Sequence, residues 1–324
     1  MEKLDVKDRK ILYHLDLDSR QSFAQIGKKV GLPKDVVTYR VKKLQDKGVI
    51  KNFIPIINSS ILGYSWYRFY FTFQYTSPEI IEEIVNYFIN VKYTHSVILL
   101  KGQYDLLINT HAKNANKAYN VWENILSKYR DYFAQQVFSV VYKSYGYRYS
   151  FLLEGINEIR PKNVRAQVCG SDTIVDIDDL DFQILKILHL NARSPTIEIA
   201  KKLHSTTNTV KNRIKKMIDI GVIKGFRINM DLSKIGYSMY KSDIILKDHN
   251  KINKIIDYIK DHPNLQGIIR SIGYVDLELV FYLTNSNKLH DIMKDISNKF
   301  PDTIKNYKYT DTIKVAKWSF FPED

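Results

Sequence analysis

The sequence VTYRVKKLQDKGVIKNF, residues 37–53, has a near copy in VKNRIKKMIDIGVIKGF, residues 210–226. Both lie inside a longer repeat, since a shift of 173 positions superimposes residues 4–65 on residues 177–238 without a gap. Matches are dense where a fold needs apolar or turn-forming residues and sparse where residues would lie on a surface. A period of this length indicates paired domains, because solenoid units are roughly 20 to 50 residues long. The chain is therefore interpreted as a tandem duplication.

Composition is that of a folded, multidomain chain. Its 324 residues, 44% of them hydrophobic, are enough for two or more domains. No stretch approaches the roughly 18 to 20 uninterrupted apolar residues of a membrane span, and the charged N-terminus does not resemble a signal peptide. We therefore expect a soluble, cytoplasmic protein. The single cysteine, Cys169, excludes an intramolecular disulfide and a thiolate metal cluster, and no metal or cofactor is expected.

The formal net charge of +14 is concentrated in the repeated segments. Residues 1–60 hold 13 Lys and Arg against 7 Asp and Glu, and residues 177–236 hold 11 against 6. Residues 61–155 and 237–324 are nearly neutral. A basic module that alternates with a neutral one predicts polyanion binding by the first and another task for the second. The alternative is that the charges only solvate helix faces.

The basic module has the pattern of a winged helix-turn-helix. Residues 8–15, 22–30 and 33–47 carry apolar residues at helical spacing, and Gly31 and Gly48 interrupt that pattern. Ser22 and Gln25 are spaced as a capping box. After the third predicted helix comes a β-prone stretch, VIKNFIPII in one copy and VIKGFRINM in the other, which fits a two-stranded wing. Three helices with a tight turn before the third, followed by a hairpin, describe this fold.

The third helix of such a fold enters the major groove, so its outward residues should meet base edges. The predicted base-reading residues are Lys34, Asp35, Thr38, Tyr39 and Lys42 in the first copy, and Thr207, Asn208, Lys211, Asn212 and Lys215 in the second. Neighbouring lysines are better placed for phosphates, which give affinity and register but little sequence information. These are Lys28, Lys29, Lys43, Lys201, Lys202 and Lys216.

Arg40 and Arg213 occupy matching places in the middle of the predicted third helices, close to buried positions. We predict that they form intramolecular ion pairs with Asp8 and Asp181 rather than contacts with bases. A structural role explains why both copies keep them.

The neutral module alternates strands and helices. The sequence YSWYRFYFTFQYT, residues 64–76, is apolar on both faces, which predicts burial by a helix on one side and a partner sheet on the other. A stacking platform for bases is the less favoured alternative. A helix from Ser77, two strands around Gly102, a helix and a final strand follow, and residues 244–320 repeat the order. This β-α-β-β-α-β order is ferredoxin-like, so the predicted class is α+β.

The winged helix, the GVIK stretch that opens the wing, the Gly-Tyr pair at its exit and G-x-x-D between the middle strands resemble the Lrp/AsnC feast-or-famine regulators. The resemblance covers nearly the whole chain, twice. It implies that the second domain mediates oligomerisation and senses an amino acid or related effector near the middle turn. The candidate effector-binding residues are Gly102, Tyr104, Asp105, Gly273, Tyr274 and Asp276.

Chemistry at this turn has two interpretations. A glycine accepts the positive φ of a tight hairpin, and a nearby carboxylate can receive an effector's ammonium group. Alternatively, the aspartate only hydrogen-bonds its own backbone. The tyrosine is displaced by one place between the copies, so the two turns need not bind one ligand.

Two other functions compete with regulation. Siroheme decarboxylases resemble the same domain pair, but their middle hairpin carries histidine and arginine, whereas LLKGQYDLL and IRSIGYVDL have glycine there. His95 alone fits a surface or core histidine, and no Ser-His-Asp order, metal-ligand spacing or phosphate loop appears. The chain is therefore predicted not to be an enzyme. The third candidate is an architectural DNA-binding protein with little sequence preference.

The expected organisation is one chain that supplies both halves of a DNA-binding dimer, with association into larger homo-oligomers as a further possibility. The predicted boundaries are residues 1–60 and 177–236 for the winged helices, 61–154 and 237–324 for the ferredoxin-like domains, and 155–176 for a linker. Because the reading helices differ, the predicted partner is double-stranded DNA with an asymmetric operator.

Overall fold

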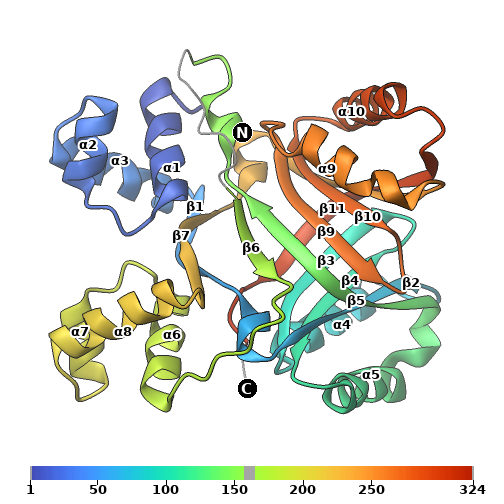
Figure 1. The fold of residues 1–324 in the computed structure, drawn as a ribbon, viewed down its shortest axis with the longest axis horizontal. Coiled ribbons are helices and arrows are strands. Elements are labelled where there is room, and N and C mark those ends of the chain that lie inside the picture. The colour runs from blue at the N-terminus through green and yellow to red at the C-terminus, as the bar shows by residue number, and fades with distance from the viewer. Residues whose placement is uncertain (1, 157–164, 323–324) are drawn as a thin grey trace.

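The computed structural model describes residues 2–156 and 165–322, and both halves of the chain repeat one order of elements (Figure 1). The first half contains α1 (Val6–Leu17), α2 (Phe23–Val30), α3 (Lys34–Asp46), β1 (Ile50–Ile57), β2 (Ser65–Phe73), α4 (Pro78–Asn90), β3 (Thr94–Gly102), β4 (Leu106–Ala112), α5 (Ala115–Tyr129) and β5 (Phe133–Tyr147). The second half contains β6 (Arg165–Cys169), α6 (Asp179–Leu190), α7 (Thr196–Lys202), α8 (Thr207–Asp219), β7 (Ile223–Met230), β8 (Ser238–Leu246), α9 (Ile252–Ile259), β9 (Leu265–Ile272), β10 (Leu277–Leu283), α10 (Ser286–Lys299) and β11 (Ile304–Trp318).

Local sequence explains the start of α2 and the turn into α3. Ser22 and Gln25 form the predicted capping box of α2, which satisfies two backbone N–H groups at the helix start. Gly31 then takes the left-handed conformation, with φ of 67°, and turns the chain into α3. The second copy makes the same turn with His204 at φ of 50°, so glycine is favoured but not indispensable there.

The predicted wing hairpins are wrong. Each copy contributes a single strand after its third helix, and β1 pairs antiparallel with β7 of the other copy, with Ile54 opposite Arg227. A 3-10 turn follows β1 and another follows β7, so neither strand folds back on its own copy. The ladder's hydrogen bonds are therefore satisfied between copies.

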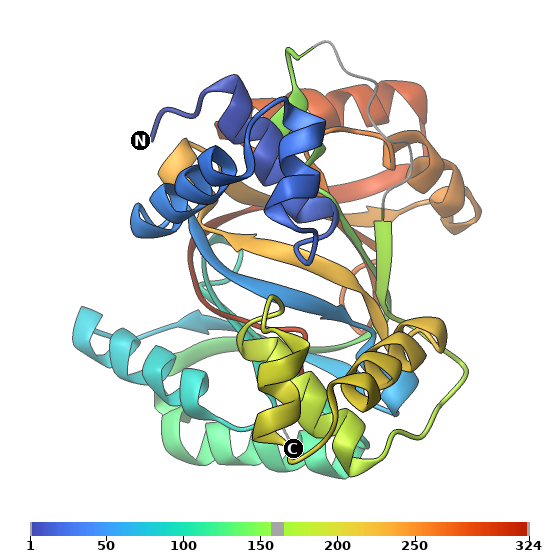
Figure 2. The same ribbon diagram turned by 90° about the vertical axis from the view of Figure 1, so that its left-hand side faces the viewer.

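The two helix-turn-helix units share one continuous apolar core. Helix α1 packs on β7 and α6 packs on β1, so each first helix contacts the other copy's strand. Backbone bonds reinforce the exchange, since Ser19 N donates to Phe226 O at 3.1 Å and Ala192 N donates to Phe53 O at 2.8 Å. Figure 2 shows the two units on either side of the paired strands β1 and β7. Their spacing is consequently fixed by a common core.

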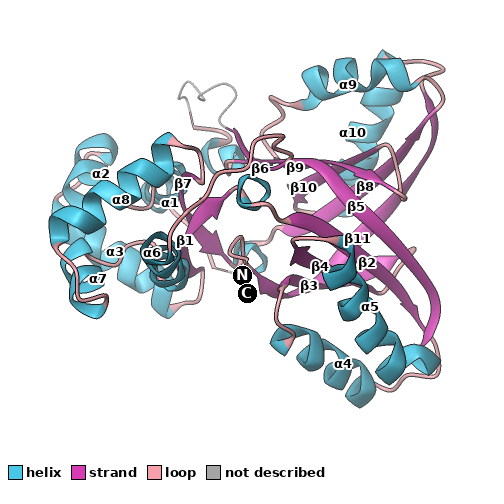
Figure 3. Ribbon diagram, turned by 60° about the horizontal axis from the view of Figure 1, so that its bottom comes forward, coloured by secondary structure: helices cyan, strands magenta, loops and turns pink. Residues whose placement is uncertain are grey.

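The remaining strands other than β6 form a closed ring (Figure 3). The first copy has the strand order β5-β2-β4-β3 and the second β11-β8-β10-β9, which is the predicted ferredoxin-like topology in both. Strand β3 pairs with β11, and β9 pairs with β5, so the two four-stranded sheets join along both edges. Joining both edges leaves no long unpaired edge on either sheet.

The two faces of the sheet have different neighbours. Phe69 and Phe71 point outward and pack with Phe88 of α4 and Ile125 of α5. Tyr70, one residue along, belongs to the cluster inside the ring. Burial on both sides confirms the prediction for the part that forms β2, whereas Tyr75, beyond the strand, is exposed. No described helix is long and apolar enough to cross a membrane.

The segment expected to be a linker lies partly outside the described residues. Its described part is ordered against the first copy, because β6 pairs antiparallel with the end of β5. Val175 N also donates to Ile61 O at 2.8 Å. The chain therefore leaves the ring along β5 before it enters the second helix-turn-helix unit.

Candidate nucleic-acid interface

Helix α3 presents its predicted reading residues to solvent. Its inner stripe of Val37, Val41 and Leu44 is buried in the shared core. The predicted residues on the outer side are all exposed: Lys34, Asp35, Thr38, Tyr39, Lys42 and Lys43. Tyr39 stands out among them, since it is an aromatic residue that is 66% exposed.

Helix α8 presents a chemically different surface from the same scaffold. Thr206 caps it by accepting a hydrogen bond from Thr209 N at 3.1 Å, and Val210, Ile214 and Met217 face inward. The outer residues are Thr207, Asn208, Lys211, Asn212, Lys215 and Lys216, all exposed except the half-buried Thr207. Asn and Gln amides pair with adenine edges, whereas lysine pairs with guanine. The two helices therefore offer different hydrogen-bonding groups.

Some predicted residues are already engaged within the protein. Thr38 Oγ1 donates to Lys34 O at 2.9 Å, one turn back on α3. Lys216 Nζ lies 3.5 Å from Asp181 Oδ2, and Lys29 Nζ donates to the Gln21 side chain. Phosphate contact by these two lysines would compete with internal partners.

The predicted ion pairs of Arg40 and Arg213 are confirmed. Arg40 Nη1 lies 2.8 Å from Asp8 Oδ1 and 2.7 Å from Asp5 Oδ2. Arg213 Nη1 makes the equivalent contacts with Asp181, at 3.3 Å, and with Asp178. The hydrogen bonds that Arg40 donates to Asp5 and Asp8 raise its pKa. These arginines tie the reading helix to the first helix.

The second aspartate that pairs with each arginine was not predicted from the sequence. Asp5 and Asp178 are the residues immediately before α1 and α6, where their side chains cap the helix by accepting from Asp8 N and Asp181 N. An aspartate three residues before another at a helix start is the signal that would have found them.

The hairpin aspartates hold the sheet together. Asp105 Oδ2 accepts from Phe73 N at 2.7 Å, and Asp276 Oδ2 accepts from Leu246 N at 2.7 Å. Each carboxylate therefore joins a turn to the end of the neighbouring strand. Gly102 has φ of 148°, and a Cβ there would lie 2.8 Å from Tyr309 O, so the turn also packs tightly on β11.

The two candidate turns meet inside the ring through their tyrosines. The rings of Tyr104 and Tyr274 have centroids 5.9 Å apart, and both contact Tyr70. Tyr274 OH donates to Asp243 Oδ2 at 2.7 Å. The structure thus gathers the tyrosines on the interior and leaves the two aspartates at separate turns.

A buried charge network fills the interior beside these tyrosines, and sequence reasoning missed it. Glu278 lies 2.6 Å from Arg68 Nη1 and 3.0 Å from Lys241 Nζ, while Lys241 lies 2.9 Å from Asp243. Burial alone would raise the pKa of Glu278, but Arg68 and Lys241 lower it to about 2. Charged residues inside otherwise apolar strands were the available signal.

Comparison with known proteins agrees with this geometry. The family model described as winged helix-turn-helix DNA-binding matches residues 4–51 and 177–224. An uncharacterised HTH-type transcriptional regulator of Pyrococcus furiosus is 31% identical over 122 residues, which cover 38% of this chain and 82% of that protein. The HTH-type transcriptional regulator LrpA of Pyrococcus horikoshii is 32% identical over 123 residues, covering 38% of this chain and 85% of its own.

A solved structure shares the doubled architecture. The siroheme decarboxylase NirDL superimposes with a TM-score of 0.64 over 98% of this chain and 94% of its own, at 13% identity. That likeness concerns the fold. The regulators match over about a third of this chain and most of their own length, as a chain built from two copies requires. The chain belongs to the Lrp/AsnC family of helix-turn-helix transcriptional regulators, as a tandem-duplicated member.

Proposed function

We propose that this DNA-binding regulator is a single-chain pseudo-dimer that reads an asymmetric operator. The observation that carries the proposal is the pair of exposed, chemically different reading helices, α3 and α8, held by one shared core. A dimer of identical chains presents two identical helices and reads a palindrome. This chain presents one of each.

Reciprocal contacts between the copies support a fixed distance between the two helices. Arg20 Nη1 donates to Ala192 O, and Arg193 Nη1 donates to Ser19 O and, at 2.9 Å, to Gln21 O. Both arginines are half-buried where the copies meet, and this burial lowers their pKa. We expect half-sites roughly 34 Å apart, or a multiple of that spacing.

The ring interior supports pairing of unlike copies. The described interior positions of β2 and β4 carry Arg68 without a carboxylate, whereas the equivalent positions of β8 and β10 carry Lys241, Asp243 and Glu278. Two first copies would bury two arginines with no counter-ion, and two second copies would bury excess carboxylates. The charges therefore favour a first copy against a second copy.

The same proposal places effector sensing at the turns Gly102–Asp105 and Gly273–Asp276, with an amino acid or related small molecule as effector. Family resemblance supports this site. The packing of Tyr104 against Tyr274 also links the two turns, so a change at one can reach the other. An effector that moves one turn would shift the tyrosine pair inside the ring.

Selection of bound sequences from a random DNA pool tests the proposal. We expect two unlike half-sites in a fixed order and spacing. A palindromic consensus would contradict the asymmetric reading. Uniform coverage of DNA with a steep salt dependence would instead favour the architectural role.

The fold of NirDL supports a second candidate, a siroheme decarboxylase-like enzyme, because the likeness covers 98% of this chain. The middle turns carry Gly102 and Gly273 where the decarboxylase pattern has histidine, and His95 is buried with its pKa lowered to about 3. Absorbance of purified protein with added siroheme decides between them. We expect no turnover, whereas stoichiometric binding with turnover would overturn the regulator assignment.

A further inference from the structure

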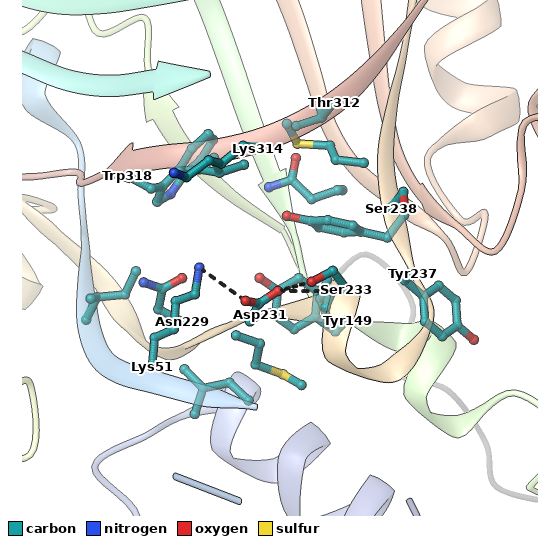
Figure 4. A pocket seen from close by; sticks show the side chains of 18 of the residues that line it. Lys51, Tyr149, Asn229, Asp231, Ser233, Tyr237, Ser238, Thr312, Lys314 and Trp318 are labelled. Atoms are coloured by element: carbon teal, nitrogen blue, oxygen red, sulfur yellow. Dashed lines mark hydrogen bonds and ion pairs between the residues drawn. The ribbon is translucent and has the colours of Figure 1, made fainter. Parts of the chain in front are cut away.

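Two adjoining cavities lie where the DNA-binding units meet the ring. The outer cavity, about 380 Å³, lies between the β1–β7 ladder and strands β8 and β11 (Figure 4). The inner cavity, about 60 Å³, lies inside the ring. Met239, Gln266, Thr312 and Trp318 line both, so the two cavities adjoin at these side chains. Their combined volume falls within the roughly 300 to 1,000 Å³ typical of small-molecule sites.

The inner cavity has an apolar wall with two unpaired polar atoms. Leu100, Leu107 and Val280 contribute to the apolar part. Arg68 Nε and His95 Nε2 are buried and have no hydrogen-bond partner within the described residues. Leaving two such atoms unpaired is costly, so a ligand that satisfies them gains affinity.

The two unpaired atoms have opposite hydrogen-bonding roles. Arg68 Nε carries a hydrogen and can only donate. His95 Nδ1 lies 3.2 Å from the Ser319 carbonyl, which can only accept, so Nδ1 holds the ring hydrogen. Because burial lowers the pKa of His95 to about 3, the ring is neutral and Nε2 is an acceptor. A hydroxyl group, which donates and accepts, matches both.

The outer cavity carries an excess of positive charge. Lys51 and Lys314 extend from opposite walls, as Figure 4 shows, and Asp231 lies 3.8 Å from Lys51. Arg227 also lines the cavity but is paired with Asp16 at 2.8 Å. Lys314 makes no ion pair among residues 2–156 and 165–322. An anionic group placed beside Lys314 would supply its missing partner.

We infer that the two cavities form one binding site for a medium-chain hydroxycarboxylate, with the carboxylate beside Lys314 and the hydroxylated end of its chain near Arg68 and His95. This site is distinct from the hairpin turns and goes beyond the proposed function. Its walls include β1 and β7 of the DNA-binding units and β8 and β11 of the ring. A bound ligand therefore touches both modules at their junction.

Calorimetric titration with straight-chain carboxylates from four to ten carbons tests the site without DNA. Affinity should rise about fourfold per methylene until the inner cavity is full, and then level off. 8-Hydroxyoctanoate should bind roughly twofold to tenfold more tightly than octanoate, because its bonds to Arg68 and His95 replace bonds to water and leave a modest net gain. Weaker binding of the hydroxylated chain would overturn the assignment of the hydroxyl group.

Two substitutions locate the ligand. Lys314→Gln should weaken all chain lengths by a similar factor, whereas Lys308→Gln, an exposed lysine on the same strand outside the cavity, should change nothing. Val280→Phe should remove the gain with chain length but keep butyrate binding. Lys314 is on the surface, so its variant should fold even if the Val280 variant does not.

Absence of carboxylate binding, binding independent of chain length, or equal loss in both lysine variants would each overturn the site. None of these results bears on operator binding, which is measured separately by DNA titration without carboxylate. A protein that binds DNA but no carboxylate keeps the proposed function and loses this inference.

Discussion

Glu278 is a buried position at which the two copies differ in charge. Its equivalent in the first copy is Leu107, which lies in the apolar cluster of the ring interior. In the second copy the carboxylate faces both Arg68 and Lys241. Glu278→Leu should lower the free energy of unfolding by about 3 to 5 kcal/mol, because it leaves Arg68 buried without its carboxylate, whereas Lys241 keeps Asp243. Urea denaturation measures the loss.

The matched control for that substitution is Glu82→Leu on α4, where the side chain is exposed. It should change stability by less than about 0.5 kcal/mol. If Glu278→Leu were equally mild, the buried network would contribute nothing to the pairing of the copies.

The stacked histidines His95 and His111 predict an acid-sensitive fold. Their rings lie 4.1 Å apart, and burial lowers the pKa of His95 to about 3 and that of His111 well below its ordinary value. Below the unfolded pKa of about 6.5, the unfolded chain binds protons that the folded chain does not. The free energy of unfolding should therefore decrease as the pH is lowered, by up to about 1.4 kcal/mol per pH unit for each histidine.

Urea denaturation between pH 6.5 and 5 measures how the free energy of unfolding changes with pH. This range lies above that in which ordinary carboxylates titrate. His95→Asn should remove about half of this pH dependence, because His111 stays buried, whereas His204→Asn, at an exposed position, should leave it as it is. A native protein whose stability did not change across this range would show that the two buried rings are not kept neutral.

At the scale of elements, the reading helices carry the DNA-binding prediction. Lys42→Ala on α3 and Lys215→Ala on α8 should each weaken operator binding by about 1 to 3 kcal/mol if they contact bases. If they contact phosphates, each should reduce the salt slope by about one. Titration of labelled operator at several salt concentrations separates the two cases. Lys254→Ala on α9, exposed and remote from both helices, is the control.

Substitutions of Asp105 in the hairpin test effector sensing separately from DNA binding. Asp105→Ala removes the acceptor for Phe73 N and should cost about 1 to 3 kcal/mol of stability. Basal DNA affinity should stay the same while the response to an effector changes. Asp105→Asn keeps an acceptor oxygen and should recover stability without recovering an ammonium contact. Loss of DNA binding in a folded Asp105 variant would remove the sensor assignment.

Helices were more predictable than strand partners, for a physical reason. The periodicity of residues 33–47 depends on local spacing, so the sequence was sufficient for it. The pairing of Arg40 with Asp8 joins residues on two different helices, and the sequence indicated it because the second copy keeps the same pair. The partner of β1 is β7, about 170 residues away, and no local pattern specifies it. The junction cavities are equally nonlocal, since the walls of the outer one come from six strands of both copies.

At the scale of the whole molecule, Asp16 joins the DNA-binding body to the ring. Its carboxylate accepts from Arg227 Nε at 2.8 Å and from Tyr149 N at 2.7 Å, and its carbonyl accepts from Arg148 at 2.6 Å. The second copy places His189 at this position, within 3.4 Å of Ser319 Oγ. The two joints are built differently, so the asymmetry extends beyond the reading helices.

Exchanging the reading surfaces tests that asymmetry directly. Four substitutions on α8 give it the outer residues of α3: Thr207→Lys, Asn208→Asp, Lys211→Thr and Asn212→Tyr. The inner stripe and Arg213 are untouched, so the shared core should be unaffected. Selection from a random pool should then yield a palindrome made of the half-site that α3 reads, at the original spacing.

The converse exchange on α3 is the matched control: Lys34→Thr, Asp35→Asn, Thr38→Lys and Tyr39→Asn. It should yield a palindrome of the other half-site, because each helix reads independently while the core fixes their separation. Together, the two consensus sequences should contain both halves of the native operator. If both exchanged proteins selected the native sequence, the outer residues of these helices would not be the ones that read bases.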